Sequence, residues 1–394
     1  MNNFFQEERE NLIKLLIDLV KEDTTNDGDE NLGNEYLAAK YVKAEFEKLN
    51  IPYEVFEKEK GRTNVIGKIG NRGPSIFLAA HLDVVPAGEG WIYPPFEPTI
   101  KGDRMWGRGV LDDKGLMASL LVMAKYLKKI EDKLNITVLI GAVADEERGS
   151  EFGMTYLADN GLVKADYAII PDNAGNMQEI NIAEKGNVAF KVKSKGLQAH
   201  AMAPQNGVNA ILHLSRFLLE LEKYEFTYEE HDLLSPPTMN IGLIKGGNVL
   251  NSVPNYAEAQ VEVRYLPSQN GEDIVNDIRK IVDRLKLEHK DLDIELEIVS
   301  ISYPIALDPN NIIVATIKEE AEGFHKKEVR LTGMGGGTVC KDLMRNGCKA
   351  LCFSAGDDEF YHQVNENISI TELVDFSNII TRVILKLNDN YKLL

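Results

Sequence analysis

The sequence predicts an α/β protein in which a mixed sheet with helices on both faces carries a smaller inserted domain. Strands alternate with helices in both the first and the last part of the 394-residue chain. Apolar runs such as 136–143 (ITVLIGAV) lack strict alternation, as expected of strands that are covered on both faces. A βαββαβ succession in between has the order of a ferredoxin-like unit.

The first part of the chain shows helical spacing of apolar residues and short apolar runs in turn. Leu12, Leu15, Leu16 and Leu19 recur at the spacing of one helix face. Seven-residue runs such as TNVIGKI are rich enough in branched apolar residues for strands. The pattern predicts helices over 7–22, 35–49, 114–128 and about 150–160, and strands over 63–69, 75–81, 136–143 and 165–171.

The pattern changes after about residue 186, where alternating strands and two amphipathic helices predict the inserted domain. The α/β character returns with a helix over 309–324, a glycine-rich stretch (TGMGGGT), a strand over 348–354 and a helix over 371–388. We therefore expect three segments: 1–185 and 301–394 form the two parts of the main domain, and 186–300 form the inserted domain.

Composition excludes several classes of function. The formal net charge is −18, which argues against nucleic acid or an anionic membrane as the main partner, because both require clustered Lys and Arg. No stretch reaches the roughly 18 apolar residues of a membrane span, and the N-terminus lacks the features of a signal peptide. The three cysteines imply no disulfide framework, so we expect a cytoplasmic protein, and for Cys348 and Cys352 core thiols are favoured over a zinc site.

Candidate metal ligands follow the second predicted strand. His81 and Asp83 are two residues apart and so project to one side of extended chain. An imidazole and a carboxylate suit Zn²⁺, and the carboxylate can alternatively orient the imidazole. On these two residues alone, a core histidine capped by a neighbouring acid is the better interpretation.

Further acids leave the ends of other predicted strands or precede a helix. Asp112 and Asp113 lie in GRGVLDDKG, where either can cap the helix that follows. The consecutive acids 145–147 (DEE) follow the strand 136–143, and Asp172 follows the strand 165–171. Ligands of open α/β sheets bind beyond the carboxyl ends of the strands. A purely structural interpretation does not explain so many carboxylates at one edge.

His362, in EFYHQVNE, adds a second imidazole to these acids. Nitrogen and oxygen donors without thiolate suit Zn²⁺, Co²⁺ or Mn²⁺. A carboxylate that is not itself a ligand can act as general base on metal-activated water. Bound cations would also offset the repulsion among the three adjacent acids.

The motifs occur in the order typical of one enzyme family. These motifs are AHLDVVP, GRGVLDDKG, ADEERGSEFG, GLQAHAMAP, GGNVLNSVP, VEVRYLP and GMGGGT, followed by His362, and the resemblance that they carry runs from about residue 10 to residue 385. The chain thereby resembles acetylornithine deacetylase, succinyl-diaminopimelate desuccinylase, aminoacylase and the related carboxypeptidases and dipeptidases, which are di-zinc metallohydrolases with a metallopeptidase-like catalytic domain.

The resemblance implies a set of roles in the catalytic domain. His81 and Asp172 hold one metal ion, Glu147 and His362 hold the other, and Asp112 bridges the two. Glu146 is implied as the general base beside a metal-bridging hydroxide. Asp83 is implied as the acid that orients His81.

The resemblance also implies roles in the inserted domain, which in this family is a lid and often the dimer interface. His200 is similar to a residue that reaches a partner subunit's active site and stabilises the oxyanion, so we expect a homodimer. The residues that match positions holding the substrate, commonly its carboxylate, are Asn251, Arg264, Gly335, Gly336 and Gly337.

The expected function is hydrolysis of an amide or peptide bond in a small carboxylate-bearing substrate. Asp172 and the second acid of LDDKG resemble the di- and tripeptidases, and Lys341 falls in a region where the glycine loop usually continues to an Arg. The chain's length is closer to the deacylases, so acyl-amino acids and short peptides both remain candidate substrates. The alternatives are a one-metal carboxypeptidase or carbamoyl-amide hydrolase, and a binding protein without turnover.

Overall fold

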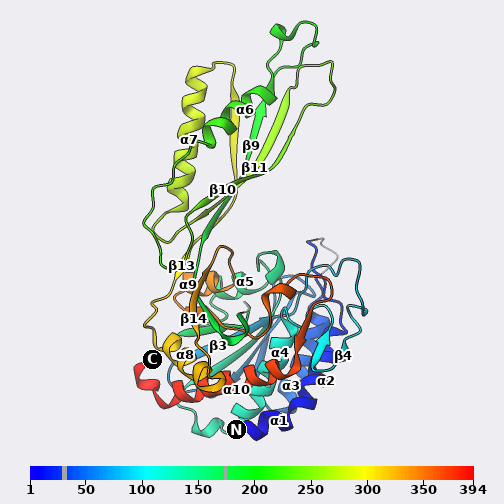
Figure 1. Ribbon diagram of the computed structural model, residues 1–394, viewed down its shortest axis with the longest axis vertical. Coiled ribbons are helices and arrows are strands. Elements are labelled where there is room, and N and C mark those ends of the chain that lie inside the picture. The colour runs from blue at the N-terminus through cyan, green and yellow to red at the C-terminus, as the bar shows by residue number, and fades with distance from the viewer. Residues whose placement is uncertain (29–32, 173–174) are drawn as a thin grey trace. The chain divides into compact units, whose positions relative to one another are not determined.

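The computed structural model describes residues 1–28, 33–172 and 175–394, and the chain forms two compact units (Figure 1). Unit 1 contains 1–182, 307–332 and 338–394, and unit 2 contains 183–306 and 333–337. The boundaries predicted from the sequence were 186 and 300, with all later residues in the catalytic domain. The assignment of 333–337 differs because this segment bonds within unit 2: the Lys185 amide donates to the Met334 carbonyl at 3.1 Å.

Among the described residues, nine strands form one mixed sheet in the order β1-β2-β6-β3-β7-β15-β8-β13, with β14 paired to β8. Strand β3 pairs in parallel with both β6 and β7, and β15 pairs in parallel with β7. These four strands therefore end at the same edge of the sheet. The bounds are β1 (Tyr53–Glu57), β2 (Thr63–Ile69), β3 (Ser75–His81), β6 (Thr137–Val143), β7 (Tyr167–Ile170), β8 (Glu179–Glu184), β13 (Ile305–Ala306), β14 (Arg330–Met334) and β15 (Lys349–Cys352).

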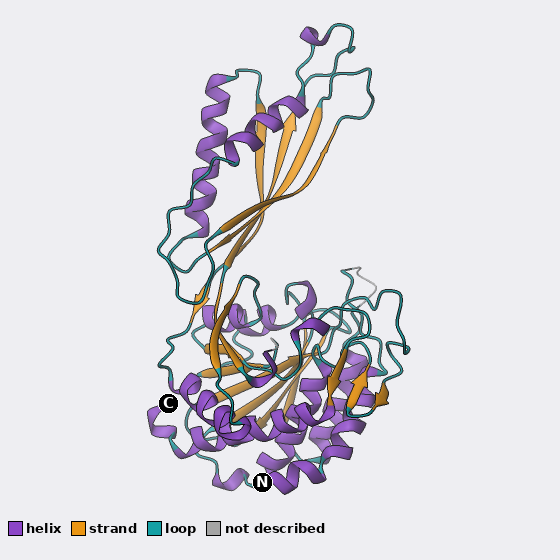
Figure 2. Ribbon diagram, in the orientation of Figure 1, coloured by secondary structure: helices purple, strands orange, loops and turns teal. Residues whose placement is uncertain are grey.

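Helices lie on both faces of this sheet, which confirms the predicted fold class (Figure 2). Helix α4 packs on β3, and α10 packs on α4 and α8. A separate three-stranded sheet contains β4 (Thr99–Lys101), β5 (Arg104–Trp106) and β16 (Asn367–Ser369). In this sheet β16, near the end of the chain, pairs with β5. The helices of unit 1 are α1 (Asn2–Glu7), α2 (Arg9–Val20), α3 (Tyr36–Lys48), α4 (Lys114–Lys129), α5 (Met154–Asp159), α8 (Ile312–His325), α9 (Cys340–Arg345) and α10 (Ile370–Asp389).

Unit 2 has the predicted βαββαβ order. It contains β9 (Gly186–Lys195), α6 (Ala210–Leu221), β10 (Thr238–Gly246), β11 (Tyr256–Tyr265), α7 (Gly271–Glu288) and β12 (Asp293–Ser302). Its antiparallel sheet runs β10-β11-β9-β12. Burial alternates along β9 and β11, so one face packs against α6 and α7 and the other face is more exposed.

The predicted helices and strands of unit 1 recur with shifts at their ends, but several short strands had no clear signal. Strands β1, β4, β5 and β16 are partly exposed or only three residues long, so they lack the apolar runs that identify β3 and β6. Cys340, Cys348 and Cys352 are free and buried, which confirms the core thiols predicted for Cys348 and Cys352. Among the described residues, no helix is long and apolar enough to cross a membrane.

Asp375 of α10 gives the fold a predicted pH dependence. Burial, and then the carboxylates of Glu372 and Asp103, raise the pKa of Asp375 from 3.8 to about 6. The folded state therefore binds this proton more tightly than the unfolded state, and the stability contributed by Asp375 is lost as pH rises from 3.8 to about 6. We expect Asp375→Asn to stabilise the protein at pH 7 by about 1 kcal/mol, after allowance for partial exposure.

Urea denaturation of both proteins at pH 4, 5 and 7 measures this effect of Asp375→Asn. The gain should grow with pH over this range. A gain that is the same at all three pH values would contradict the prediction.

Candidate metal centre

His81, the last residue of β3, and Asp112 meet at the carboxyl edge of the large sheet. The Nε2 atom of His81 lies 2.9 Å from Oδ1 of Asp112, and both side chains are buried. The Nδ1 atom lies 2.9 Å from the main-chain carbonyl of Asp83, which accepts its hydrogen in the Nδ1–H tautomer. A carbonyl acceptor at Nδ1 fixes the ring so that Nε2 faces the carboxylates.

The second carboxylate oxygen of Asp112 faces a different imidazole. Its Oδ2 lies 3.0 Å from Nε2 of His362, and the same nitrogen lies 3.1 Å from Oε2 of Glu147. His362 adopts a left-handed backbone conformation with φ of 58°. Asp112 thus presents one oxygen to each of two histidines, which is the arrangement expected of a bridging carboxylate.

The electrostatics of this cluster favour bound cations. Hydrogen bonds with Asp112 and Glu147 raise the pKa of His362 to about 10. Burial lowers the pKa of His81, but the carboxylates of Asp112 and Asp83 outweigh it and raise the pKa well above 6.5. Protons and metal ions compete for the same imidazole nitrogens, so carboxylates that hold a proton there also attract a divalent ion.

The donor set fits divalent metal ions. Among the described residues, Oε1 of Glu147 is buried without a hydrogen-bond partner, a costly state for a carboxylate oxygen that a cation would relieve. One candidate set consists of His81, Asp112 and Glu147, whose ligand atoms lie within 4.8 Å of one another. His81, Glu146 and Asp172 meet the same criterion. These are nitrogen and oxygen donors without thiolate, as Zn²⁺, Co²⁺ and Mn²⁺ accept.

Asp83 joins the end of β3 to the turn that follows β6. Its buried carboxylate accepts the main-chain amides of Glu146 at 3.0 Å and Glu147 at 3.1 Å. It also accepts a hydrogen bond from Nδ2 of Asn26 at 2.9 Å. The carboxylate lies 3.6 Å from Nδ1 of His81, so the carbonyl of Asp83 is the closer partner of the imidazole. Asp83 therefore contacts both the histidine and the segment that bears Glu146 and Glu147.

Asp145, the first acid of the DEE sequence, is a structural residue in this geometry. It has φ of 63° at the start of the short 3₁₀ turn 146–148. Its Oδ1 pairs with Nη2 of Arg62 at 2.8 Å and accepts from Asn26 at 2.9 Å, and its Oδ2 accepts the Phe152 amide at 3.1 Å. Arg62 also binds Glu35 through two nitrogens, so a buried network supports the turn.

We expect Asp145→Asn to lower the free energy of unfolding by about 2 kcal/mol. The amide group would face the Phe152 N–H and would remove one charged partner of Arg62, while asparagine tolerates the left-handed backbone. The midpoint of urea denaturation measures the change. The matched control is Glu151→Gln, which alters an exposed pair with Lys58 and should change stability by less than about 0.5 kcal/mol. Equal effects of the two substitutions would refute the assignment.

Glu146 and Asp113 are acids whose charge is suppressed in this cluster. Burial, and then the charge of Asp172, raise the pKa of Glu146 well above 4.5. Burial also raises the pKa of Asp113 well above 3.8. Asp113 precedes α4, but the alternative that its side chain caps this helix is wrong: its Oδ2 accepts the His81 amide at 3.2 Å instead. Tertiary contact with β3 thus displaces the local cap.

Comparison with known proteins identifies the family of this chain. Residues 77–386 match peptidase family M20/M25/M40. The chain belongs to this family. It is a metal-dependent hydrolase, in agreement with the predicted resemblance.

Two curated relatives cover most of this M20 chain. An uncharacterised metallohydrolase of Methanocaldococcus jannaschii is 31% identical over 351 residues, which are 82% of this chain and 84% of the relative. A probable succinyl-diaminopimelate desuccinylase of Staphylococcus aureus is 29% identical over 98% of this chain and 99% of its own length.

Solved structures share the fold of this M20 protein. The aminopeptidase PepT of Bacillus cereus superposes with a TM-score of 0.76 at 23% identity, covering 95% of this chain and 98% of PepT. A protein of Bacillus subtilis described as a dinuclear metal binding peptidase of the M20 family has a TM-score of 0.73 at 16% identity, covering 98% of this chain and 99% of its own.

The remaining predicted residues of the M20 site lie in unit 2, where they form two groups. His200 bridges to Ser252 in the antiparallel sense, beside Asn251, whose carbonyl accepts the Ala201 amide at 3.0 Å. Arg264 of β11 donates through Nη1 to the Gly335 carbonyl at 3.3 Å, and Gly336 and Gly337 follow. Arg264 also pairs with Glu262.

Sequence patterns did not reveal Asn26, Arg62 or Glu366, although all three contact the segments that carry the ligands. Arg62 precedes β2 and Asn26 lies in a polar loop, where charged and amide residues are ordinary. Glu366 lies four residues after His362 in HQVNE. No periodicity or spacing distinguishes such residues from surface ones, so only the tertiary structure identifies them.

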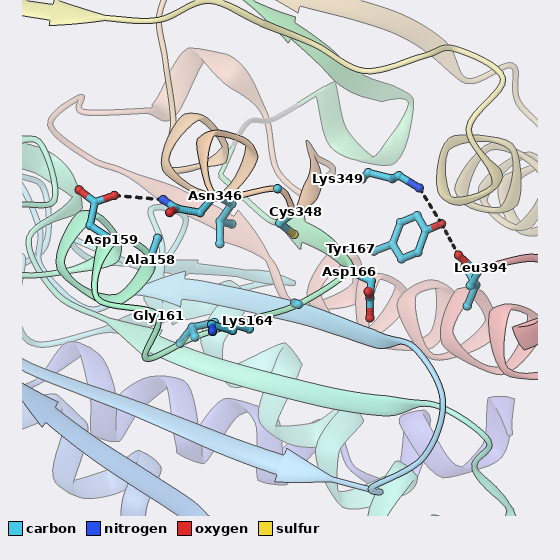
Figure 3. A pocket seen from close by; sticks show the side chains of 14 residues that line it. Ala158, Asp159, Gly161, Lys164, Asp166, Tyr167, Asn346, Cys348, Lys349 and Leu394 are labelled. Atoms are coloured by element: carbon cyan, nitrogen blue, oxygen red, sulfur yellow. Dashed lines mark hydrogen bonds between the residues drawn. The ribbon is translucent and has the colours of Figure 1, made fainter.

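A cavity of about 440 Å³ lies elsewhere in unit 1, beside the starts of β7 and β15 (Figure 3). Lys349 donates to the Tyr167 hydroxyl at 3.3 Å, and that hydroxyl donates to the Leu394 carbonyl at 3.0 Å. The thiol of Cys348 also lines it, and burial raises its pKa to about 12. None of the candidate metal ligands lines this cavity, so it is separate from the metal centre.

Proposed function

We propose that this M20 protein uses two divalent metal ions, most readily Zn²⁺, with Co²⁺ or Mn²⁺ as alternatives, to hydrolyse an amide or peptide bond in a small substrate that bears a carboxylate. The observation that carries the proposal is the position of Asp112, whose two oxygens each face the Nε2 atom of a different histidine. The description of the Bacillus subtilis relative as dinuclear is consistent with two ions.

In the proposed site, His81 and Asp172 hold one ion, Glu147 and His362 hold the other, and Asp112 bridges them. When bound, the ions would supply Lewis-acid polarisation of the scissile carbonyl and would acidify a water molecule. Asp83 keeps the imidazole of His81 and the 146–147 amides in fixed positions, which lowers the cost of assembling the ligands.

Glu146 is proposed as the general base. It lies in the turn beside Glu147, and its ligand-type oxygen lies within 4.8 Å of donor atoms of His81 and Asp172. A carboxylate there can take the proton of the attacking water at its free oxygen and return it to the leaving amine.

In unit 2, Asn251, Arg264 and the glycines 335–337 are proposed to bind the substrate's carboxylate, and His200 is proposed to donate to the oxyanion in the active site of a partner subunit. The contact of Arg264 with Gly335 supports a common role for this pair. A guanidinium matches a planar carboxylate better than an ammonium group does. We propose that unit 2 also forms the interface of a homodimer.

The exposed edge of β10 supports that interface. Strand β10 lies at the end of the four-stranded sheet, and Ile241, Leu243 and Ile244 on it are exposed. An apolar edge strand presents main-chain donors and acceptors with which another chain can pair. Sedimentation equilibrium tests this point: a dimer is expected, and Ile244→Lys should shift it toward the monomer.

A hydrolysis screen with each of Zn²⁺, Co²⁺ and Mn²⁺ tests the function. It uses acetyl- and succinyl-amino acids beside dipeptides and tripeptides, because the relatives include a desuccinylase and an aminopeptidase. Turnover of one class identifies the substrate. Retention of two ions without hydrolysis of any of these compounds would favour a binding protein on this fold, and retention of one ion would favour a one-metal enzyme.

A further inference from the structure

The carboxylate of Glu366 accepts four N–H groups from one loop, the segment 107–112 that carries Asp112. Its Oε1 accepts the amides of Leu111 at 2.7 Å and Asp112 at 3.1 Å. Its Oε2 accepts the Gly109 amide at 3.0 Å and Nη1 of Arg108 at 2.7 Å. The side chain is fully buried. Both carboxylate oxygens of Glu366 therefore stabilise the conformation of this loop.

The chain topology places Glu366 opposite this loop. Strand β16 pairs antiparallel with β5, with Asn367 opposite Trp106. Glu366, one residue before β16, therefore lies opposite Gly107, one residue after β5, and its carbonyl accepts the Gly107 amide at 3.1 Å. The side chain can then reach along the loop as far as Asp112.

Arg108 neutralises this buried acid and extends the contact to a third segment. It is buried beside Glu366 and also donates to the carbonyls of Pro86 and Ala87 at 3.3 and 3.4 Å. Its guanidinium lies 5.3 Å from the ring centroid of Trp91. Pro86 follows the strand end that carries His81 and Asp83, so the pair joins three segments that bear ligand or supporting residues.

We propose that Glu366 is a positioning residue for the metal pair. Glu366 lies on the same segment as His362, and it holds the loop that carries Asp112 at a fixed distance from that histidine. The inference rests on the proposed two-metal function, because Asp112 is the residue expected to contact both ions. Glu366 contacts no ion itself. It acts by accepting hydrogen bonds from the Leu111 and Asp112 amides. These bonds hold the main chain of Asp112 and so set the position from which its side chain extends.

Glu366→Gln tests the proposal with the smallest change of shape. The amide group of glutamine would face the Gly109 N–H or Arg108, so two donors would oppose each other and the loop would shift. We expect the affinity for Co²⁺ to fall about 10–100-fold, as is usual when a partner of a ligand segment is lost. Equilibrium dialysis with Co²⁺ alone measures the affinity, and the visible absorption of bound Co²⁺ reports the changed ligand geometry.

A double substitution separates positioning from general stability. Arg108→Met with Glu366→Met removes both buried charges together, which usually restores the stability lost when one partner of a pair is removed. It does not restore the acceptors of the loop amides. The unpaired amides still cost stability, so we expect the double variant to be no less stable in urea than Glu366→Gln, with Co²⁺ affinity still reduced at least tenfold. Leu373→Ala, a buried residue of α10, is the control that loses stability and keeps the affinity.

The results distinguish this inference from the proposed function. Wild-type Co²⁺ affinity in Glu366→Gln or in the double variant would overturn the positioning role. Failure of all three Glu366 and Arg108 variants, including Glu366→Asp, to fold would also overturn it, because the pair would then serve the fold as a whole. Failure of the wild-type protein to bind two ions, or to hydrolyse any compound of the screen, would count against the proposed function instead.

Discussion

Replacing Glu146 by glutamine is expected to lower kcat about 10²–10⁴-fold while two metal ions remain bound. Glutamine keeps the shape of the side chain but cannot take the proton of the attacking water. The hydrogen bond from the Glu146 main-chain amide to the Asp83 carboxylate does not involve the Glu146 side chain, so the turn should keep its conformation. Steady-state kinetics on a substrate found in the screen, with metal analysis of the same sample, measures both quantities.

The neighbouring residue provides the matched comparison for Glu146. Glu147→Gln should lose metal because Oε2 of Glu147 contacts His362 at the proposed second ion. Glu151→Gln, an exposed change in the same segment, should leave both metal content and kcat unaltered. If Glu146→Gln lost metal while Glu147→Gln retained it, the two roles would have to be exchanged.

Replacing Asp112 by asparagine is expected to abolish tight binding of both ions and to lower kcat/KM at least about 10³-fold. The neutral amide offers one weak oxygen donor, so only one of the two histidines would keep an acceptor there. The Oδ1 and Oδ2 atoms of Asp112 contact the Nε2 atoms of His81 and His362, respectively, so both contacts depend on this carboxylate. Metal analysis after dialysis, followed by kinetics at saturating metal, measures the loss.

His362→Ala is the informative comparison for Asp112→Asn. It removes a ligand from one proposed site and leaves His81 with Asp112 and Asp172, so one ion per chain should remain. Loss of a single ion in Asp112→Asn, with loss of two in His362→Ala, would show that Asp112 does not bridge the pair. Comparing the number of ions that the two variants lose therefore tests whether Asp112 bridges the ions, and not only whether metal binds.

Much of the candidate site could be predicted because strand ends are visible in the sequence. Apolar runs locate β3, β6 and β7, and polar residues directly after such runs in a parallel sheet must gather at one edge. His81, the acids 145–147 and Asp172 follow from this rule. The sequence could not separate Asp145 from Glu147, because three adjacent acids look equivalent until the turn gives each a direction. In the structure, Asp145 points to Arg62 and Glu147 to His362.

Residues that act through buried networks could not be predicted. Asn26 and Arg62 bond to Asp145 across more than eighty positions of sequence, and Glu366 reaches Asp112 across 254. Their local sequence is polar and irregular, and hydrogen bonding between distant segments has no periodicity. The segment 333–337 shows the same limit, since its assignment to unit 2 depends on bonds to Lys185 and Arg264.

The sequence by itself determined the α/β class and the βαββαβ insertion, because hydrophobic period is a local property, and its ordered motifs gave the resemblance to the family. The tertiary structure decided which oxygen of Asp112 faces which histidine, why Asp145 is structural, and how Glu366 holds the loop. Those outcomes depend on register between strands far apart in the chain and on the requirement that buried donors and acceptors be paired.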